Sequence, residues 1–381
     1  VHALAADDGK QLWQFTAEGR IDSSPTYYSG AILFGSADGW VYCLNAADGQ
    51  LAWRFRAAPA ERKDCDDGQL ESIWPVHGTV LVQNDALYVT AGRSSFLDGG
   101  IVLYRINPAT GEELSKTVLY HLDPETGKQL VAESGFNMDG TATDILTGDG
   151  ENVYLKYFSF DRLGQRTNAA TPHLFAITGL LGEEWFVRSY WIVGSGKPGA
   201  GWGGWASAAG KFPSGRILSF DDSTVYGYGR KTVSGGPVGH RADAYHLFSP
   251  ARKPGDQRPA VPRPDRKGKK RRPAPKAPPV NWSKENVLIV RAMALAGDRL
   301  VIAGPPDLGR KTSGILAYEN QEEALSGFHG EKGVFLRIVS VQDGAQISQH
   351  ELTSLPVFDG MSTAAGNVYI SLRDGSVECW G

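Results

Sequence analysis

Two stretches near the start of the chain decide its fold: Val1-His2-Ala3-Leu4-Ala5-Ala6-Asp7-Asp8-Gly9-Lys10-Gln11-Leu12-Trp13 and Val41-Tyr42-Cys43-Leu44-Asn45-Ala46-Ala47-Asp48-Gly49-Gln50-Leu51-Ala52-Trp53. Each reads as a strand, a tight turn and a strand, because an Asp-Gly pair is typical of a hairpin turn. In both, a tryptophan follows the glycine by four positions. A unit that returns in the same register indicates a repeat protein.

Weaker copies of this unit occur further along the chain, at Tyr104–Gly111, His121–Gly127 and Val339–Gly344. In the first of them Ser115 takes the place of the tryptophan, so the motif degrades while its spacing persists. The repeat therefore extends over nearly the whole chain.

A second signature precedes the first and completes the repeating unit. Ile32–Cys43 reads as a strand, an Asp-Gly hairpin and a strand, and Val368–Cys379 repeats this pattern at the C-terminus. One unit is then four short antiparallel strands. Such a sheet cannot bury both faces alone, whereas radial stacking of several sheets buries them. The pattern predicts an all-β fold, a β-propeller of four-stranded antiparallel blades.

The repeats can be divided into blades along the chain. We expect one propeller domain over residues 1–381, with seven blades favoured and eight as the alternative. The two ends supply partial blades, so we expect the chain to be a processed or excised piece of a longer protein. The expected blades and partial blades cover residues 1–16, 20–57, 70–120, 135–192, 202–285, 287–352 and 357–381.

One segment, residues 250–281, interrupts the fourth expected blade with proline and basic residues. Residues 251–280 hold eleven Lys and Arg against two Asp, so this segment carries +9 and the rest of the chain −12 of the overall net charge of −3. Proline and like charges oppose regular structure, so we expect a disordered insertion. It is a candidate contact for a polysaccharide or another polyanion, although it has no aromatic residues with which to stack on bases.

At the residues quoted above, the pattern resembles the PQQ-like, BamB-like β-propeller family. The Gly-x-x-x-Trp ending resembles that family's tryptophan docking motif, which implies that Trp13 and Trp53 stack on neighbouring blades. Gln69–Gly78, Ala91–Gly100 and Phe358–Met361 resemble segments of large multidomain bacterial members without an assigned activity. The resemblance therefore implies a fold more than a function.

The sequence disfavours a bound cofactor or metal. Members that bind pyrroloquinoline quinone (PQQ) usually carry a vicinal Cys-Cys pair and a calcium site, and this chain holds only Cys43, Cys65 and Cys379. We interpret Cys43 and Cys379, at equivalent repeat positions on apolar strands, as small buried core residues. The histidines form no pair with metal-ligand spacing. We therefore predict no PQQ, calcium or other metal.

The first group of candidate ligand-binding residues lies around residues 70–77, which we interpret as an innermost strand. Period-two alternation places Glu71, Ile73 and His77 on one face, and Trp74 of the same segment is a further candidate. Six residues of strand span about 20 Å, so the two side chains form a dyad only if Pro75 marks a sharp bulge. Arg93 and Asp98 follow on a loop, either as a local ion pair or as part of a pocket.

A second group of candidates is aromatic and cationic. Arg188, Trp191, Trp202 and Trp205 lie in a glycine-rich stretch, and Asp359 lies near the C-terminus. An aromatic face can pack on the C–H groups of a sugar ring, so these residues are candidates for sugar binding, with core packing as the alternative.

No complete set of catalytic residues is present in the sequence. The favoured interpretation is a non-catalytic propeller module, a binding or scaffolding unit of a larger exported or envelope protein. The alternative is an enzyme, either a degenerate quinoprotein dehydrogenase or a carbohydrate-active lyase or hydrolase. Partners would be other domains of the parent or envelope proteins. No apolar run is long enough to span a membrane. We expect a monomeric module in the periplasm or outside the cell.

Overall fold

The computed structural model describes residues 1–66, 68–130, 140–176, 191–195, 212–230, 245–252, 280–285, 288–308 and 318–381. The chain divides into two compact units: unit 1 is residues 1–182 with 195–197, and unit 2 is residues 183–194 with 198–381. Each unit is described by itself below. A single domain over residues 1–381 stays a prediction.

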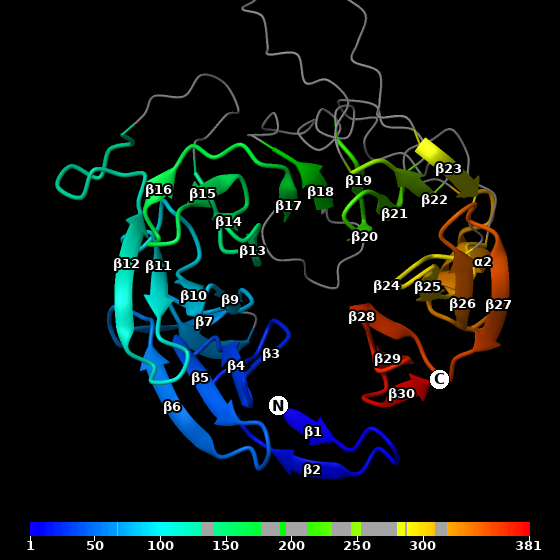
Figure 1. Ribbon diagram of the computed structural model, residues 1–381, viewed down its shortest axis with the longest axis horizontal. Helices are drawn as coiled ribbons and strands as arrows, with labels where there is room; N and C mark the ends of the chain where they lie inside the picture. Colours follow the sequence, from blue (N-terminus) through cyan, green and yellow to red (C-terminus); the bar gives the residue numbers. More distant parts are fainter. Residues whose placement is uncertain are drawn as a thin grey trace, which may run out of the picture. The chain divides into compact units, whose positions relative to one another are not determined.

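Unit 1 is built from antiparallel sheets whose strands pair in the order of the chain (Figure 1). Three of its sheets have four strands each. The first consists of β3 (Thr26–Tyr28), β4 (Ala31–Gly35), β5 (Trp40–Asn45) and β6 (Leu51–Arg56), and the second of β9 (Leu81–Gln83), β10 (Ala86–Ala91), β11 (Ile101–Ile106) and β12 (Glu113–Leu119). The third consists of β13 (Leu146–Gly148), β14 (Val153–Leu155), β15 (Phe158–Phe160) and β16 (Arg166–Thr167). Two-stranded sheets are formed by β1 (His2–Leu4) with β2 (Gln11–Gln14) and by β7 (Lys63–Asp66) with β8 (Gln69–Ser72), and β17 (His173–Ala176) follows.

Unit 2 follows the same plan. Its strands β18 (Trp191–Gly194) and β19 (Ser214–Gly215) pair with each other. Two four-stranded sheets follow, made of β20 (Ile217–Phe220), β21 (Val225–Arg230), β22 (Tyr245–Pro250) and β23 (Val280–Glu285), and of β24 (Ala292–Ala296), β25 (Arg299–Gly304), β26 (Phe335–Ser340) and β27 (Gln346–Glu351). A three-stranded sheet of β28 (Pro356–Ala364), β29 (Asn367–Leu372) and β30 (Val377–Trp380) comes last, and helix α2 (Gln321–Phe328) lies between β25 and β26.

These sheets confirm the predicted fold class, an all-β chain of four-stranded antiparallel propeller blades. One expected boundary differs. The blade placed over residues 135–192 is already complete at Thr167, where β16 ends, and β17 and β18 lie beyond it. The strands of this sheet are only two or three residues long, too short for their period to be read from sequence. The number of blades stays a prediction.

The insertion at residues 250–281 separates two strands that pair with each other. Strand β22 ends at Pro250 and β23 begins at Val280, and Ser249 of β22 lies opposite Trp282 of β23. The segment therefore connects neighbouring strands of one sheet. Residues 253–279, on which the predictions of disorder and of a polyanion contact depend, lie outside the described residues.

All five copies of the first repeat form the same turn. In the second copy, Asn45 N–H donates to the carbonyl of Gln50 and Gly49 N–H donates to the carbonyl of Asn45, both at 2.8 Å. The matching bonds occur in the copies that begin at Ala5, Asn107, Asp123 and Ser340. The five glycines have φ between 65° and 74°, a left-handed conformation that glycine adopts without strain.

Three tryptophans join one repeat to the turn of the next. Within unit 1, the indole Nε1 of Trp13 donates to the carbonyl of Ala46 at 3.0 Å, and that of Trp53 donates to Pro108 at 3.1 Å. A Cβ on Gly49 would lie 2.6 Å from the Trp13 ring, so only glycine admits this contact. In unit 2, Trp282 makes the same bond to Val341 at 2.7 Å.

Alternation along the strands lets one sheet of unit 1 bury both faces. On β4 and β5, Leu33 and Val41 pack toward the sheet β9–β12, whereas Phe34 and Tyr42 pack toward the N-terminal strands. Strand β10 repeats this arrangement. Its residue Leu87 packs toward the sheet β3–β6, and Tyr88, on the opposite face of the strand, packs toward the sheet β13–β16. Each fully buried aliphatic or aromatic side chain contributes about 1.5–3 kcal/mol, so stacked sheets hold unit 1 together.

Unit 2 has the same two-faced sheets. On β25, Leu300 and Ile302 pack with the sheet β20–β23, whereas Val301 and Ala303 pack with the sheet β28–β30. Helix α2 begins after Asn320, whose side chain accepts from the backbone N–H of Glu323 and caps the first turn.

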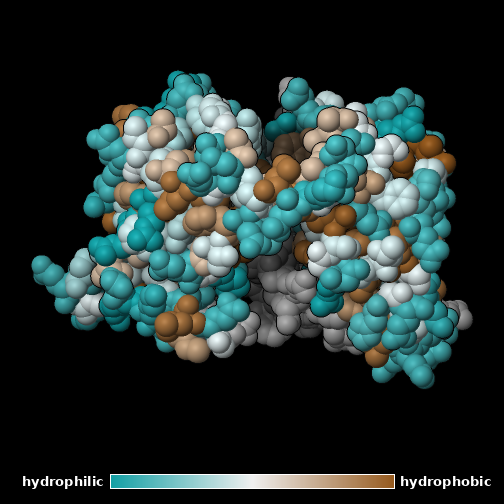
Figure 2. Space-filling view, turned by 90° about the horizontal axis from the view of Figure 1, so that it is seen from below, coloured by the Kyte–Doolittle hydropathy of each residue, from teal (hydrophilic) through white to brown (hydrophobic). Residues whose placement is uncertain are grey.

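The face of the molecule drawn in Figure 2 is mainly hydrophilic. On this face, hydrophobic side chains occur in small groups among hydrophilic ones. Cys43 is buried, as expected, but Cys379 is exposed, because β30 is the outermost strand of its three-stranded sheet in unit 2. Among the described residues, no helix has the length and apolar character needed to cross a membrane.

Candidate functional site

The strand expected around residues 70–77 is shorter than predicted. Strand β8 ends at Ser72, and the chain then turns. The Ser72 hydroxyl accepts from Trp74 N–H at 3.1 Å, and Val76 N–H donates to the carbonyl of Ser36 at 3.1 Å. Backbone bonds to other segments thus replace the ladder of a strand. Because the segment bends, Glu71 and His77 come together, which corrects the separation of about 20 Å expected for straight strand.

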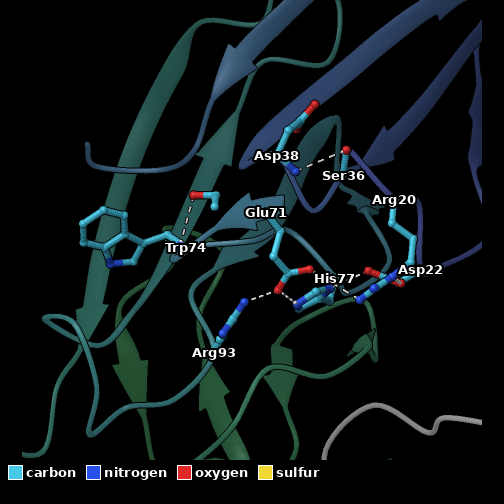
Figure 3. A network of polar contacts seen from close by, with 9 residues as sticks. Arg20, Asp22, Ser36, Asp38, Glu71, Trp74, His77 and Arg93 are labelled. Atoms are coloured by element: carbon cyan, nitrogen blue, oxygen red, sulfur yellow. Dashed lines mark hydrogen bonds and ion pairs between the residues drawn. The ribbon is translucent and has the colours of Figure 1, made fainter. Parts of the chain in front are cut away.

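Glu71 lies at the centre of a group of charged side chains (Figure 3). Its side chain is 1% exposed, and its two oxygens face different arginines. Arg93 Nη2 donates to Oε1, and Arg20 Nη2 lies 3.5 Å from Oε2. The imidazole Nε2 of His77 lies 3.8 Å from Oε1. A buried carboxylate needs such partners, because burial of an unpaired charge costs several kcal/mol.

Asp22 joins the same group from the other side of His77. The imidazole Nδ1 lies 2.5 Å from Asp22 Oδ2, and Arg20 Nε donates to Asp22 Oδ1. Burial acts to raise the pKa of Asp22, but the hydrogen bonds from His77 and Arg20 outweigh it and hold this pKa below its ordinary value of 3.8. Asp22, Arg20, Glu71 and His77 therefore form a closed ring of polar contacts, and Arg93 contacts Glu71 from outside this ring. We call these five residues the Glu71 cluster.

Backbone contacts hold Arg93 in position. It lies two residues after the end of β10, and Gly92 between them donates its N–H to the carbonyl of Pro75 at 3.1 Å. Gly92 has a φ of 115°, and a Cβ there would lie 2.6 Å from the carbonyl oxygen of Gly100. The Arg93 carbonyl accepts from Thr143 N–H at 3.0 Å. Arg93 thus sits on a segment fixed from both sides, which is the support that a preorganised site needs.

Arg20 and Asp22 were not among the residues singled out from the sequence. Their segment is fixed by the bond from Ala37 N–H to the Arg20 carbonyl at 2.8 Å. No shared spacing marks the two acids in the sequence. Asp22 lies three residues before Pro25 and four before β3, whereas Glu71 lies within β8, four residues before Pro75. Only the folded chain brings both acids to His77.

Trp74 and Asp98 contact each other but not the cluster. The indole Nε1 of Trp74 donates to the backbone carbonyl of Asp98 at 2.8 Å, and the Trp74 side chain is buried. The Asp98 side chain is exposed, and Arg93 pairs with Glu71, so the ion pair considered between Arg93 and Asp98 does not form. Trp74 stabilises the loop that carries Arg93, and its ring is not available to a sugar.

A second buried acid, Asp144, lies next to the Glu71 cluster in unit 1. It follows Thr143, and its backbone carbonyl lies 2.4 Å from where a Cβ on Gly78 would be. Its Oδ1 accepts from Ile145 N–H at 2.7 Å, whereas Oδ2 has no partner in the described chain. Burial raises the pKa of Asp144 to about 7, although the ammonium of Lys156 opposes this increase. Burial also lowers the pKa of Lys156.

The remaining predicted residues do not join this group. Trp191 begins β18 in unit 2, where it pairs with Gly215 and is buried, so packing accounts for it. Asp359 lies in unit 2 on β28, with an exposed side chain and its backbone N–H bonded to the carbonyl of Arg291 at 2.8 Å. Arg188, Trp202 and Trp205 lie outside the described residues.

The described residues offer few donors for a metal or a quinone. In the described part of the chain, no three His, Cys, Asp or Glu side chains gather closely enough to hold a metal ion. All three cysteines are free thiols: Cys43 is buried and Cys65 and Cys379 are exposed. These residues do not supply the vicinal cysteine pair and calcium ligands that the family resemblance implies for PQQ. We therefore derive no chemistry through that group.

The first third of the chain matches a known family model. Residues 1–130 match the family model described as outer membrane protein assembly factor BamB, a PQQ-like repeat model. Among curated proteins, no sequence matches the chain.

Solved structures resemble the chain over nearly its whole length. BamB from Moraxella catarrhalis is 11% identical, with a TM-score of 0.49 over 98% of this chain and 88% of that one. The quinohemoprotein alcohol dehydrogenase ADHIIG from Pseudomonas putida HK5 is 12% identical, with a TM-score of 0.50 over 97% of this chain and 66% of that one. At this identity the likeness shows the fold alone.

Proposed function

We propose that this chain, whose residues 1–130 match a BamB-type repeat model, is a ligand-binding module and not an enzyme, with its ligand site at the Glu71 cluster. The ligand class that fits is a small molecule or chain end that carries a carboxylate. The proposal depends most on the closed ring of polar contacts, in which the titratable groups already have protein partners.

The state of His77 argues against acid–base catalysis. Its Nδ1 faces Asp22 at 2.5 Å and its Nε2 faces Glu71 at 3.8 Å, so both ring nitrogens are directed at carboxylates. A general base needs a nitrogen directed at the proton it removes. Both carboxylate oxygens of Glu71 face an arginine. Glu71 therefore does not face a substrate as the second carboxylate of a glycoside hydrolase must.

The arginines of the cluster support binding. The side chains of Arg20 and Arg93 are 34% and 28% exposed, although each also faces the buried Glu71. A guanidinium has five N–H donors in a planar fork that matches a carboxylate. Glu71 fixes the orientation of both forks, so a ligand carboxylate would meet donors that are already in place. This preorganisation lowers the entropic cost of binding.

We place this module in a larger exported or envelope protein, where other domains or envelope proteins are its partners. The family description, an outer membrane protein assembly factor, supports this setting. We further propose that the module is a monomer and carries no PQQ or calcium.

Titration calorimetry with glucuronate, galacturonate and succinate, with neutral glucose as the control ligand, tests the carboxylate site. We expect the acids alone to bind, and we expect Arg93→Lys to weaken them about tenfold, because lysine keeps the charge but loses the fork. Arg162→Lys, an exposed arginine elsewhere in unit 1, is the matched control. Binding that is absent for all three acids, or that Arg162→Lys weakens equally, would overturn the proposal.

A separate assay tests the enzymatic alternative. The chain is incubated with PQQ and Ca²⁺, and alcohol-dependent reduction of an artificial electron acceptor is followed by absorbance. We expect no reduction above a sample without protein. A PQQ-dependent rate that saturates with alcohol would show a quinoprotein and overturn the non-catalytic assignment.

A further inference from the structure

A basic pocket of about 230 Å³ lies in unit 1, and no residue of the Glu71 cluster lines it. Its walls come from β6 and from the segment that leads into β7, and Ser72 of β8 contributes to its floor. Successive residues of a strand point to opposite faces. On β8, Glu71 therefore enters the Glu71 cluster while Ser72 enters the pocket.

The sequence of β6 explains why cations gather there. Trp53 and Phe55 pack on the core between sheets, so Arg54 and Arg56 point to the opposite face, toward the pocket. After β6 the chain continues through two buried alanines, Ala57 and Ala58. The N–H groups of both donate to the Gly39 carbonyl at 3.0 Å.

Arg62 and Lys63 follow this alanine pair in the chain and also line the pocket. Cations from two separated segments therefore face one small space. Charges of one sign that converge in this way repel one another unless a counter-ion lies between them.

The acidic residues of the pocket leave part of this charge uncompensated. Four cations and three carboxylates line it, a net charge of +1. Asp38 is buried and accepts from Tyr42 Oη at 2.6 Å and from Trp40 N–H at 2.9 Å. Glu18 pairs with Arg54 at 3.2 Å, and Arg54 also lies 4.4 Å from the Trp40 ring centre.

Two cations of the pocket have no such partner. Within the described chain, neither Arg56 nor Lys63 has an ion-pair partner, and Glu61 is the only carboxylate of the lining left to balance them and Arg62. Arg62 instead lies over the Trp74 ring, 5.8 Å from its centre. The cations of the lining therefore outnumber its carboxylates by one.

We propose that this pocket binds a tetrahedral oxyanion, namely a phosphate or sulfate group carried by a small ligand. Arginine and lysine from two sides suit an anion with acceptor oxygens in several directions, whereas a planar carboxylate is met best by a single fork. The volume is below the 300–1,000 Å³ or so of pockets for drug-sized ligands, so one oxyanion and the group attached to it fit better than a large cofactor.

Titration calorimetry of the whole chain at low ionic strength tests this site. The ligands are inorganic phosphate, inorganic sulfate, glucose 6-phosphate and glucose 6-sulfate, with glucose as the neutral control. We expect binding that Arg56→Gln/Lys63→Gln weakens about tenfold or more, since a tenfold change needs only about 1.4 kcal/mol. Added NaCl should weaken it as well, because the pocket is open to solvent.

The control removes the same two charges elsewhere in unit 1. Arg162→Gln/Lys128→Gln should bind as the wild type does, because neither side chain lines the pocket or belongs to the Glu71 cluster. Binding through phosphate alone or sulfate alone supports the site and identifies its ligand. The proposal is overturned if no oxyanion binds, or if the control variant weakens binding as much as the pocket variant. Failure of the carboxylate site would leave this result unchanged.

Discussion

Glu71 and Asp144 are buried to nearly the same extent in unit 1, yet their surroundings differ. Glu71 is 1% exposed and faces two guanidinium groups and an imidazole, whereas Asp144 is 2% exposed and has one backbone N–H and a more distant lysine. The comparison teaches that burial alone does not decide the charge of a carboxylate. The partners that the fold brings to it do.

The largest effect is expected from Glu71→Gln. The change leaves the guanidinium groups of Arg20 and Arg93 facing a neutral amide, and breaking a buried ion pair in this way costs about 3 to 5 kcal/mol. Urea unfolding followed by tryptophan fluorescence measures the loss in the free energy of unfolding. Glu125→Gln, an exposed carboxylate, is the control and should change stability by less than about 0.5 kcal/mol. Equal effects of the two changes would mean that the cluster is not a stabilising network.

An effect of the opposite sign is expected from Asp144→Asn. The folded-state pKa of Asp144, about 7, lies above the ordinary 3.8, so the folded chain holds this proton more tightly than the unfolded chain does. The contribution of Asp144 to the free energy of unfolding is therefore fully present below about pH 4 and is lost as the pH rises through the folded-state pKa of about 7. We expect Asp144→Asn to stabilise the protein by about 2 kcal/mol at pH 8 and very little at pH 4. Unfolding curves at both pH values measure this, and a pH-independent difference would contradict it.

The smallest effect is expected from Asp22→Asn, and its pH dependence is reversed. The pKa of Asp22 lies below 3.8 in the folded state, so its contribution is present above that value and is lost as pH falls through the folded-state pKa. We expect Asp22→Asn to cost about 1 kcal/mol at pH 7 and less at pH 3. If Asp22→Asn and Asp144→Asn changed stability in the same direction with pH, the contrast between the two environments would be wrong.

The repeat made the blades and their turns predictable, because each turn depends on residues within a few positions of one another. Asn45 and Gly49 carry a turn that any copy of the motif can form alone. Trp282 makes the same contact to the next turn as Trp13 and Trp53 but was missed. The insertion separates it from its partner strand, so the spacing of the motif is lost at this position.

The candidate site was less predictable. Glu71, His77 and Arg93 were recognised as candidates, but alternation along a straight strand placed Glu71 and His77 too far apart to interact. The chain bends after Ser72 because Ile73 and Val76 donate their N–H groups to Arg62 and Ser36, which belong to other segments. No local pattern records such bonds.

The sequence by itself determined the all-β repeat, the glycine-dependent turns and the two-faced sheets, since alternation and turn chemistry are local properties. Only the tertiary structure brought Asp22 and Arg20 to Glu71 and His77, and only it left Asp144 with a lysine as its one nearby charge. The physical reason is that the ionisation and orientation of a buried charge depend on groups within a few ångströms in space. Stacked sheets supply those groups from segments far apart along the chain.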